Sequence, residues 1–209
     1  MKYLINDVPY FSQWESPQLA EGILSDEIDA KNDPNWKSSG AKTKEEYAIW
    51  SANACGMACT KMILAKEIGK VIPIVELANK SLLYGVYILP LEDSVGLLYG
   101  PYIKFLSKEY GFETKLVRPL TLNQIMYELS LSNYVIASVS PKIRHTNETP
   151  ANKSGHLVLM LGYDLNKKVL YFHNPSGFKP ETQSYVMISF SDFYKFFSGR
   201  GLIVKNIRY

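Results

Sequence analysis

The chain has 209 residues, of which 46% are hydrophobic and 21% charged, a composition that folds around a core. Its length favours one domain over two. The net charge of +3 is too small to indicate nucleic-acid binding, and no apolar run reaches the ~18 residues that a membrane span needs. Residues 1–6 do not form a secretion signal, so we expect a cytoplasmic protein.

The N-terminal part of the chain has an extended segment followed by a long polar stretch. Asp7 to Gln13 is expected to be extended because Pro9 disfavours a helix. From Trp14 to about Lys44, repeated Pro and Gly predict a long surface excursion with one short helix. Between Trp14 and Trp50, eight acidic residues and four lysines give a charge of −4, which leaves +7 for the rest. We interpret residues 14–50 as a polar acidic insertion in a single domain, 1–209; two solvated surfaces are the simplest explanation of the charge.

Four helices are predicted next. The first begins at Cys55 and runs to about Ile68, where Gly69 is a typical stop. The fourth starts at Thr121, with Gln124 three residues on as in a capping box. The two between them are expected at Ile74–Leu83 and Leu98–Tyr110.

After Ser132 the pattern changes to β-branched and apolar runs that predict about five strands. The expected strands are Tyr134–Ser140, His156–Tyr163, Lys168–His173, Ser184–Phe190 and Leu202–Ile207. A hairpin turn is expected at 164–167 and a short helix around 193–197. Helices followed by antiparallel strands predict an α+β fold, with the N-terminal helices packed on the sheet.

The two cysteines, Cys55 and Cys59, lie four residues apart on one predicted helix. Helical geometry suits a disulfide poorly, and no second ligand pair suggests zinc, so free thiols are expected. Cys55 falls where the helix should start, and the free amides there favour a thiolate and could donate to an oxyanion. Gly56 would leave room for a substrate backbone. A buried helix cysteine is the alternative for Cys55, and a structural role is expected for Cys59.

Among the three histidines, His156 is the best candidate for a general base, because it follows Gly155 at the start of a strongly apolar strand. His145 lies in a polar segment and is expected to be solvated, whereas His173 ends a strand and is a second candidate. Asn174 opens the turn 174–177 and could accept from a histidine ring and fix its tautomer, or could be a plain turn residue. The order Cys, His, Asn is that of papain.

Four short motifs carry a resemblance to a known family. They are Val8–Gln13, Asn53–Ala58, Gly155–Leu159 and Asn174–Gly177. Together they resemble the bacteriocin-processing peptidases, and more closely the stand-alone domains similar to them. That family has a papain-like fold and cleaves peptide bonds, often after a double-glycine leader, with a Cys-His-Asp triad. The closing segment Phe193–Val204, with Gly199-Arg200-Gly201, is also similar to the family's C-terminal end.

The resemblance implies that Cys55 is the nucleophile, His156 the base and Gln13 an oxyanion donor. Asn174 stands where the family usually has Asp. Compact members have the Gln only several residues before the Cys, whereas 42 positions separate Gln13 from Cys55 here, so Asn53 is the alternative donor. The segment between them is therefore expected to border the site and to favour basic peptides, although a remote decoration is the alternative.

The expected function is that of a cysteine peptidase acting on a peptide or protein substrate. No metal and no organic cofactor is implied. The acidic stretch Asp26 to Asp33 lacks the Gly and Glu of a calcium hand. An amidase or acyltransferase with the same triad, and an inactive peptide-binding module, remain open, as do the substrate sequence, the pathway and the oligomeric state. A structural role leaves the spaced Cys, His and Asn unexplained.

Overall fold

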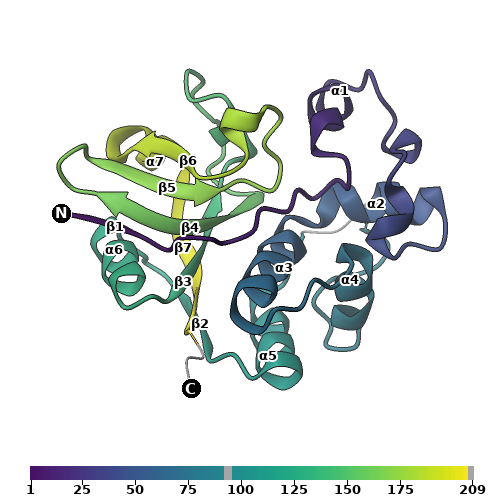
Figure 1. Cartoon of the computed structure of the whole chain (residues 1–209), viewed down its shortest axis with the longest axis horizontal. Coiled ribbons are helices and arrows are strands. Elements are labelled where there is room, and N and C mark those ends of the chain that lie inside the picture. Colours follow the sequence, from purple (N-terminus) through teal and green to yellow (C-terminus); the bar gives the residue numbers. More distant parts are fainter. Residues whose placement is uncertain (92–95, 207–209) are drawn as a thin grey trace.

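A computed structural model describes residues 1–91 and 96–206 and shows two halves side by side, one helical and one built on a sheet (Figure 1). This is the expected α+β architecture. The helical half contains α2 (Lys44–Asn53), α3 (Cys55–Ile68), α4 (Ile74–Leu82) and α5 (Tyr99–Tyr110). Two further helices, α6 (Leu122–Ser130) and α7 (Phe190–Phe196), lie against the sheet half.

The sheet of the described residues has seven strands, and every pairing in it is antiparallel. The strands are β1 (Lys2–Leu4), β2 (Thr114–Val117), β3 (Tyr134–Val139), β4 (His156–Asp164), β5 (Val169–His173), β6 (Val186–Ser189) and β7 (Phe197–Val204). Their order is β2-β7-β3-β4-β5-β6. Strand β1 pairs with residues 162–164 of β4, just past the residues that pair with the start of β3.

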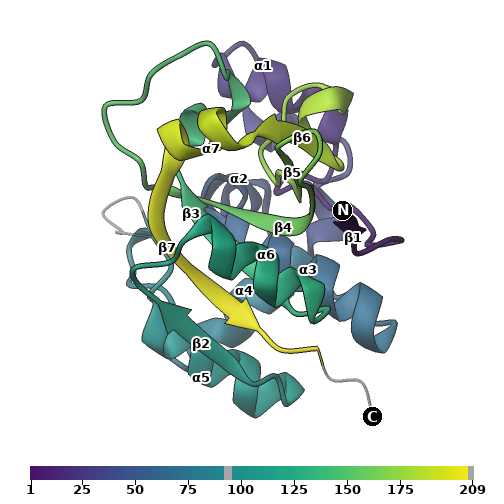
Figure 2. The same ribbon diagram turned by 90° about the vertical axis from the view of Figure 1, so that its left-hand side faces the viewer.

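The central strands β3 and β4 are buried along their whole length. Helices α3 and α6 both contact β4, and Figure 2 shows α6 in front of the sheet with α3 behind it. Cover on both faces explains why the sequence of β4 is almost continuously apolar instead of alternating.

The predicted helices are confirmed in position. Helix α3 begins at Cys55 and ends at Ile68, and Gly69 follows in the left-handed conformation (φ +66°) that glycine adopts without strain. Residues 56–64 of α3 are all buried, which makes it the central helix of its half. The capping box is also present, because Thr121 and Gln124 bond each other's backbone amide.

The expectation of about five strands was wrong, since the sheet has seven. Strands β1 and β2 are only three and four residues long, too short to give a periodic signal. The last strand was expected over 202–207 but begins at Phe197 and ends at Val204, and residue 207 lies outside the described ranges.

Residues 14–50 form more structure than the one short helix that we expected. They contain α1 (Ala20–Leu24), three short 3₁₀ turns and most of α2. Asp33 is buried at their centre and accepts from the backbone amide and hydroxyl of Ser16 and from the hydroxyl of Tyr47. Tyr47 and Trp50 on α2 are buried as well, so the end of the segment belongs to the core.

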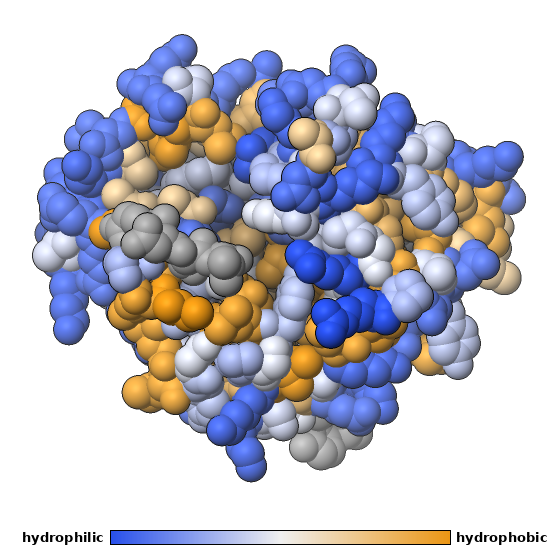
Figure 3. Space-filling model, turned by 180° about the vertical axis from the view of Figure 1, so that it is seen from behind, coloured by the Kyte–Doolittle hydropathy of each residue, from blue (hydrophilic) through white to orange (hydrophobic). Residues whose placement is uncertain are grey.

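The extended N-terminal segment crosses from the sheet half to the helical half (Figure 1). Along the way Val8 accepts from the ring of His173, and the amide of Gln13 donates to Pro175. Seen from behind, the surface mixes hydrophobic and hydrophilic residues and is hollowed near its middle, between the halves (Figure 3). No helix of the described residues is long and apolar enough to cross a membrane.

Candidate active site

Cys55 and His156 line the same cavity, of about 360 Å³, at the boundary of the two halves. Cys55 is the first residue of α3 and His156 the first of β4. The packing of α3 on β4 therefore brings two element ends together from positions 101 apart in the sequence. Of the two thiols, Cys55 is partly exposed and Cys59 fully buried, and both are free.

The ring of His156 is held by Asn174, which follows the end of β5. His156 Nε2 lies 2.8 Å from Asn174 Oδ1. The backbone amide of Ser176 also donates to Oδ1, which identifies that atom as the acceptor. Nε2 must therefore carry the proton, and Nδ1 is the basic atom of the neutral ring.

The pKa of His156 is lowered to about 3, mainly by burial and then by the nearby Arg144 guanidinium, while the hydrogen bond to Asn174 opposes both effects. The imidazole is consequently neutral at physiological pH. A neutral ring can accept a proton, which a base requires, although one with so low a pKa is weak.

The expected lowering of the Cys55 pKa is not found. Burial raises the pKa of this thiol, and the backbone amides of Leu157, Gly56 and Cys55 oppose that effect without overcoming it. The start of α3 does supply amides to the sulfur, as the sequence predicted, but removing a thiolate from water costs more. The resting pair is thus a thiol and a neutral imidazole.

Two residues behind the histidine were not anticipated. The Arg144 guanidinium donates through Nε and Nη2 to Ser176 Oγ, at 3.1 and 2.9 Å, and through Nε to the Ser176 carbonyl. Ser176 Oγ in turn lies 3.0 Å from His156 Nε2 and donates to Asn174 Oδ1 at 3.3 Å. Ser176 lies inside the motif 174–177. Arg144 lies in a polar segment, and nothing in the sequence there marks this arginine as a partner of Ser176.

Gln13 is buried beside the C-terminal end of α2. Its Nε2 donates to the carbonyl of Ser51 at 2.8 Å, which uses one of the two N–H bonds of the amide. Among the described residues that line the cavity, Asn53 is one and Gln13 is not. The side-chain amide of Asn53 donates to the Ile49 carbonyl inside α2.

The remaining histidines and Cys59 have other surroundings. His173 is fully buried; its Nε2 donates to the Val8 carbonyl and its Nδ1 accepts from the Tyr185 amide, which leaves no free nitrogen for a base. Burial lowers its pKa to about 4. His145 is exposed as expected, but its ring also packs on Phe178. Cys59 contacts the carbonyl of Leu157 from the interior of α3, and burial raises its pKa well above the usual value.

Gly56 does not leave room for a substrate. A Cβ at this position would lie 2.5 Å from Leu97 Cδ1 and 3.2 Å from Leu157 Cδ1. The space beside Gly56 is therefore already filled by two side chains, and Leu97 and Leu157 both line the cavity. The glycine allows these side chains to pack close to the helix start.

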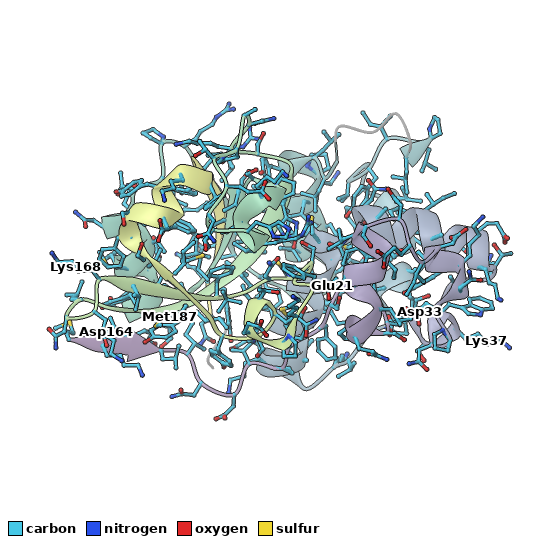
Figure 4. All side chains as sticks on the ribbon, turned by 90° about the horizontal axis from the view of Figure 1, so that it is seen from above. Glu21, Asp33, Lys37, Asp164, Lys168 and Met187 are labelled. Carbon is cyan, nitrogen blue, oxygen red and sulfur yellow. The ribbon has the colours of Figure 1, made fainter. Side chains whose placement is uncertain are left out.

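Only part of the acidic segment 14–50 reaches the loop that carries Asn174. The carbonyl of Pro17 accepts from Gln183, and Glu21 forms an ion pair with Lys179. Figure 4 shows Glu21 over the boundary between the halves and Asp33 toward the far end of the helical half. Glu21 also lines a second cavity, of about 430 Å³, together with Arg144.

Within the described ranges, no group of three or more His, Cys, Asp or Glu side chains is placed to hold a metal ion. The carboxylate of Asp33, in the stretch that we compared with a calcium hand, accepts from Ser16, Asn35 and Tyr47 instead.

Comparisons with known proteins place this arrangement in a family. The model of the peptidase C39-like family matches residues 5–201. A protein described as a C39-like peptidase from Bacillus anthracis has a similar structure, with a TM-score of 0.59 at 14% identity over 98% of this chain and 97% of that one. The peptidase domain of Streptococcus ComA, a bi-functional ABC transporter of a quorum-sensing pathway, gives a TM-score of 0.47 at 16% identity, over 73% of this chain and 91% of that domain.

No curated protein matches the chain. The fold is nevertheless that of the solved C39-like structure, and the family match covers nearly the whole sequence. The chain belongs to the peptidase C39-like family.

Proposed function

We propose that the protein is a cysteine peptidase in which Cys55 is the nucleophile, His156 the general base and Asn174 the residue that orients the base. The observation that carries the proposal is the bond between His156 Nε2 and Asn174 Oδ1 beside the cavity that Cys55 lines. With Nε2 bonded to Asn174, Nδ1 is the ring atom left to take the thiol proton.

In the proposed reaction the Cys55 proton moves to Nδ1 as the sulfur attacks the carbonyl carbon of the scissile bond. The amide of Cys55 stabilises the oxyanion, and Gln13 adds a second donor if its free N–H, now buried beside Ser51, turns toward the cavity. When the C–N bond breaks, the proton passes from Nδ1 to the leaving amine, which leaves a thioester on Cys55. His156 then takes a proton from water, whose oxygen attacks the thioester and releases the acid, and the thiol is regenerated.

The pKa directions set the manner of activation. Because burial raises the pKa of Cys55 and lowers that of His156, a preformed thiolate–imidazolium pair is disfavoured. We propose that proton transfer accompanies attack on the substrate, as general-base catalysis. The same pKa directions would also suit an inactive peptide-binding module, so turnover has to be tested directly.

The test combines labelling with turnover. A peptidyl electrophile should label the parent and a Cys59→Ala variant at Cys55 and should not label Cys55→Ala. Cleavage of a peptide mixture, followed by mass spectrometry, should fall by several orders of magnitude in His156→Ala and change little in His145→Ala. Peptide binding without cleavage by the folded parent would establish the inactive module, and release of products from non-peptide amides alone would establish an amidase.

A further inference from the structure

We propose that the cavity beside Cys55 binds a carboxylate of the substrate and that Arg200 holds it. This inference deepens the proposed function and rests on it, since it names the chemical class of substrate that the same site takes. Arg200 lies on β7 and lines the cavity together with Cys55 and His156.

An irregularity in the sheet places Arg200 there. Strand β7 pairs with β3 at Gly201↔Ala137 and at Phe197↔Val139, so residues 198–200 lie opposite Ser138 alone. Ser198 donates to the Ser138 carbonyl. Gly199, between Ser198 and Arg200, has a φ of +72°. Bulges of this kind re-aim a side chain next to a site, and here the affected strand contributes Arg200 to the cavity wall.

The guanidinium has bonding capacity left. Its Nε donates to Ser138 Oγ at 3.4 Å, a long bond, and its Cζ lies 5.7 Å from the centre of the Tyr99 ring. No ion pair of the described residues involves Arg200. An arginine carries five N–H donors in a planar fork that matches a carboxylate, so the Nη groups can bind one bidentately.

The rest of the cavity favours an anion as well. No Asp or Glu is among the described residues that line it, and Leu97, Leu98 and Leu157 supply apolar wall. Charge-assisted hydrogen bonds gain strength beside such a wall because competing water is excluded. Arg144 adds a second positive charge near Cys55. The local field therefore opposes the preference for basic peptides that the overall charge of residues 14–50 suggested.

Two sources could supply the carboxylate: an Asp or Glu side chain near the scissile bond, or the free C-terminus of a short peptide. Both present the same group to Arg200. A cavity of about 360 Å³ lies at the small end of ligand sites, which suits one such group and its immediate neighbours.

The test measures selectivity in the parent and in Arg200→Gln, with Arg200→Lys as the conservative variant. Lys37→Gln is the matched control, because it removes an equal charge from an exposed residue at the far end of the helical half (Figure 4). The substrates are peptide mixtures that differ only in Asp and Glu against Asn and Gln, each with a free or an amidated C-terminus. Cleavage is followed by mass spectrometry.

We expect the parent to prefer peptides with the carboxylate, and Arg200→Gln to lose about ten- to hundredfold in kcat/KM on these peptides and little on their amide counterparts. Arg200→Lys should keep part of the preference, and Lys37→Gln all of it. Comparing Asp and Glu peptides with their Asn and Gln counterparts, and free with amidated C-termini, shows which of the two groups supplies the carboxylate.

Binding of the same peptides to Cys55→Ala, read by fluorescence polarisation, separates this inference from the proposed function. A carboxylate preference in binding that disappears with Arg200→Gln supports the subsite even if the parent cleaves nothing. Equal binding of acidic and amide peptides, or a preference that survives Arg200→Gln, overturns it.

Discussion

Replacing Arg144 by methionine should shift the pH dependence of the site toward higher pH. The Arg144 guanidinium and His156 Nε2 are both within 3.0 Å of Ser176 Oγ, so they lie at most about 6 Å apart. At that separation two unit charges interact with about 0.7 kcal/mol in bulk water and about 3 kcal/mol at the effective dielectric constant of a protein surface. The pKa of His156 should therefore rise by about 0.5 to 2 in Arg144→Met.

The sign follows from which form Arg144 disfavours. Its positive charge opposes protonation of His156 and favours the thiolate of Cys55, so removing it raises the pKa of both groups. The acid limb of kcat/KM against pH should move upward with His156, and the rate of Cys55 alkylation should reach its plateau at higher pH. Titration of the His156 ring by NMR measures the first shift directly.

The controls separate charge from packing. Lys142→Met removes an exposed cation from the same 3₁₀ turn, 141–144, where Lys142 is paired with Glu148. This variant should change neither the acid limb of kcat/KM nor the pH dependence of Cys55 alkylation. Arg144→Lys keeps the charge, so the pKa of His156 should stay close to its value in the parent even if the paired hydrogen bonds from Nε and Nη2 to Ser176 are lost. Other charged or titratable groups at the second cavity, Glu21 and His145 among them, are unchanged in all variants. If both pH profiles, of kcat/KM and of Cys55 alkylation, are unaltered in a stably folded Arg144→Met, the electrostatic argument is refuted.

Four further outcomes are expected. Brief iodoacetamide treatment should modify Cys55 before Cys59 by mass spectrometry, because only the first is exposed to the cavity; the reverse order would contradict the assignment. His173→Ala should lower the free energy of unfolding in urea by about 3 kcal/mol, since it removes the partner of the buried Val8 carbonyl and of the partly buried Tyr185 amide. Asp33→Ala should cost about 3 kcal/mol in the same assay and expose residues 14–50 to limited proteolysis, whereas unchanged protection would show that this network is dispensable. A Gly-Ser linker in place of Ser16–Lys44 should alter peptide preference through the loss of the contacts at Pro17 and Glu21, and parent-like rates on basic, neutral and acidic peptides would exclude a role in access.

The positions of Cys55, His156 and Asn174 could be predicted because each lies at the end of an element. Helix propensity and Gly69 located α3, so Cys55 could be placed at its start. The apolar run of β4 located His156, and the turn after β5 located Asn174. These signals are local. The antiparallel pairing of β4 with β5 brings His156 and Asn174 together, and the packing of α3 on β4 adds Cys55.

The electrostatics of the site could not be predicted in the same way. The effect of burial on the Cys55 thiol depends on what α3 packs against, which no local pattern states. Arg144 and Ser176 meet across 32 positions, and only the folded loops bring them behind His156. The space beside Gly56 is filled by Leu97, from a segment whose approach to α3 has no signature in the sequence.

The neutral Asn174 is consistent with the positive charge that surrounds it. An Asp at this position would raise the pKa of His156 and would also attract the Arg144 guanidinium, which already bonds the adjoining Ser176. Such an ion pair would compete with His156 for the carboxylate oxygens. An amide fixes the tautomer through Oδ1 without that competition, at the cost of a weaker base. In the proposed mechanism, the positive potential near the sulfur, from Arg144 and from Arg200 on the cavity wall, would favour the negative charge that develops on the sulfur during attack and the oxyanion that follows. The site would then combine a weak base at His156 with stabilisation of negative charge.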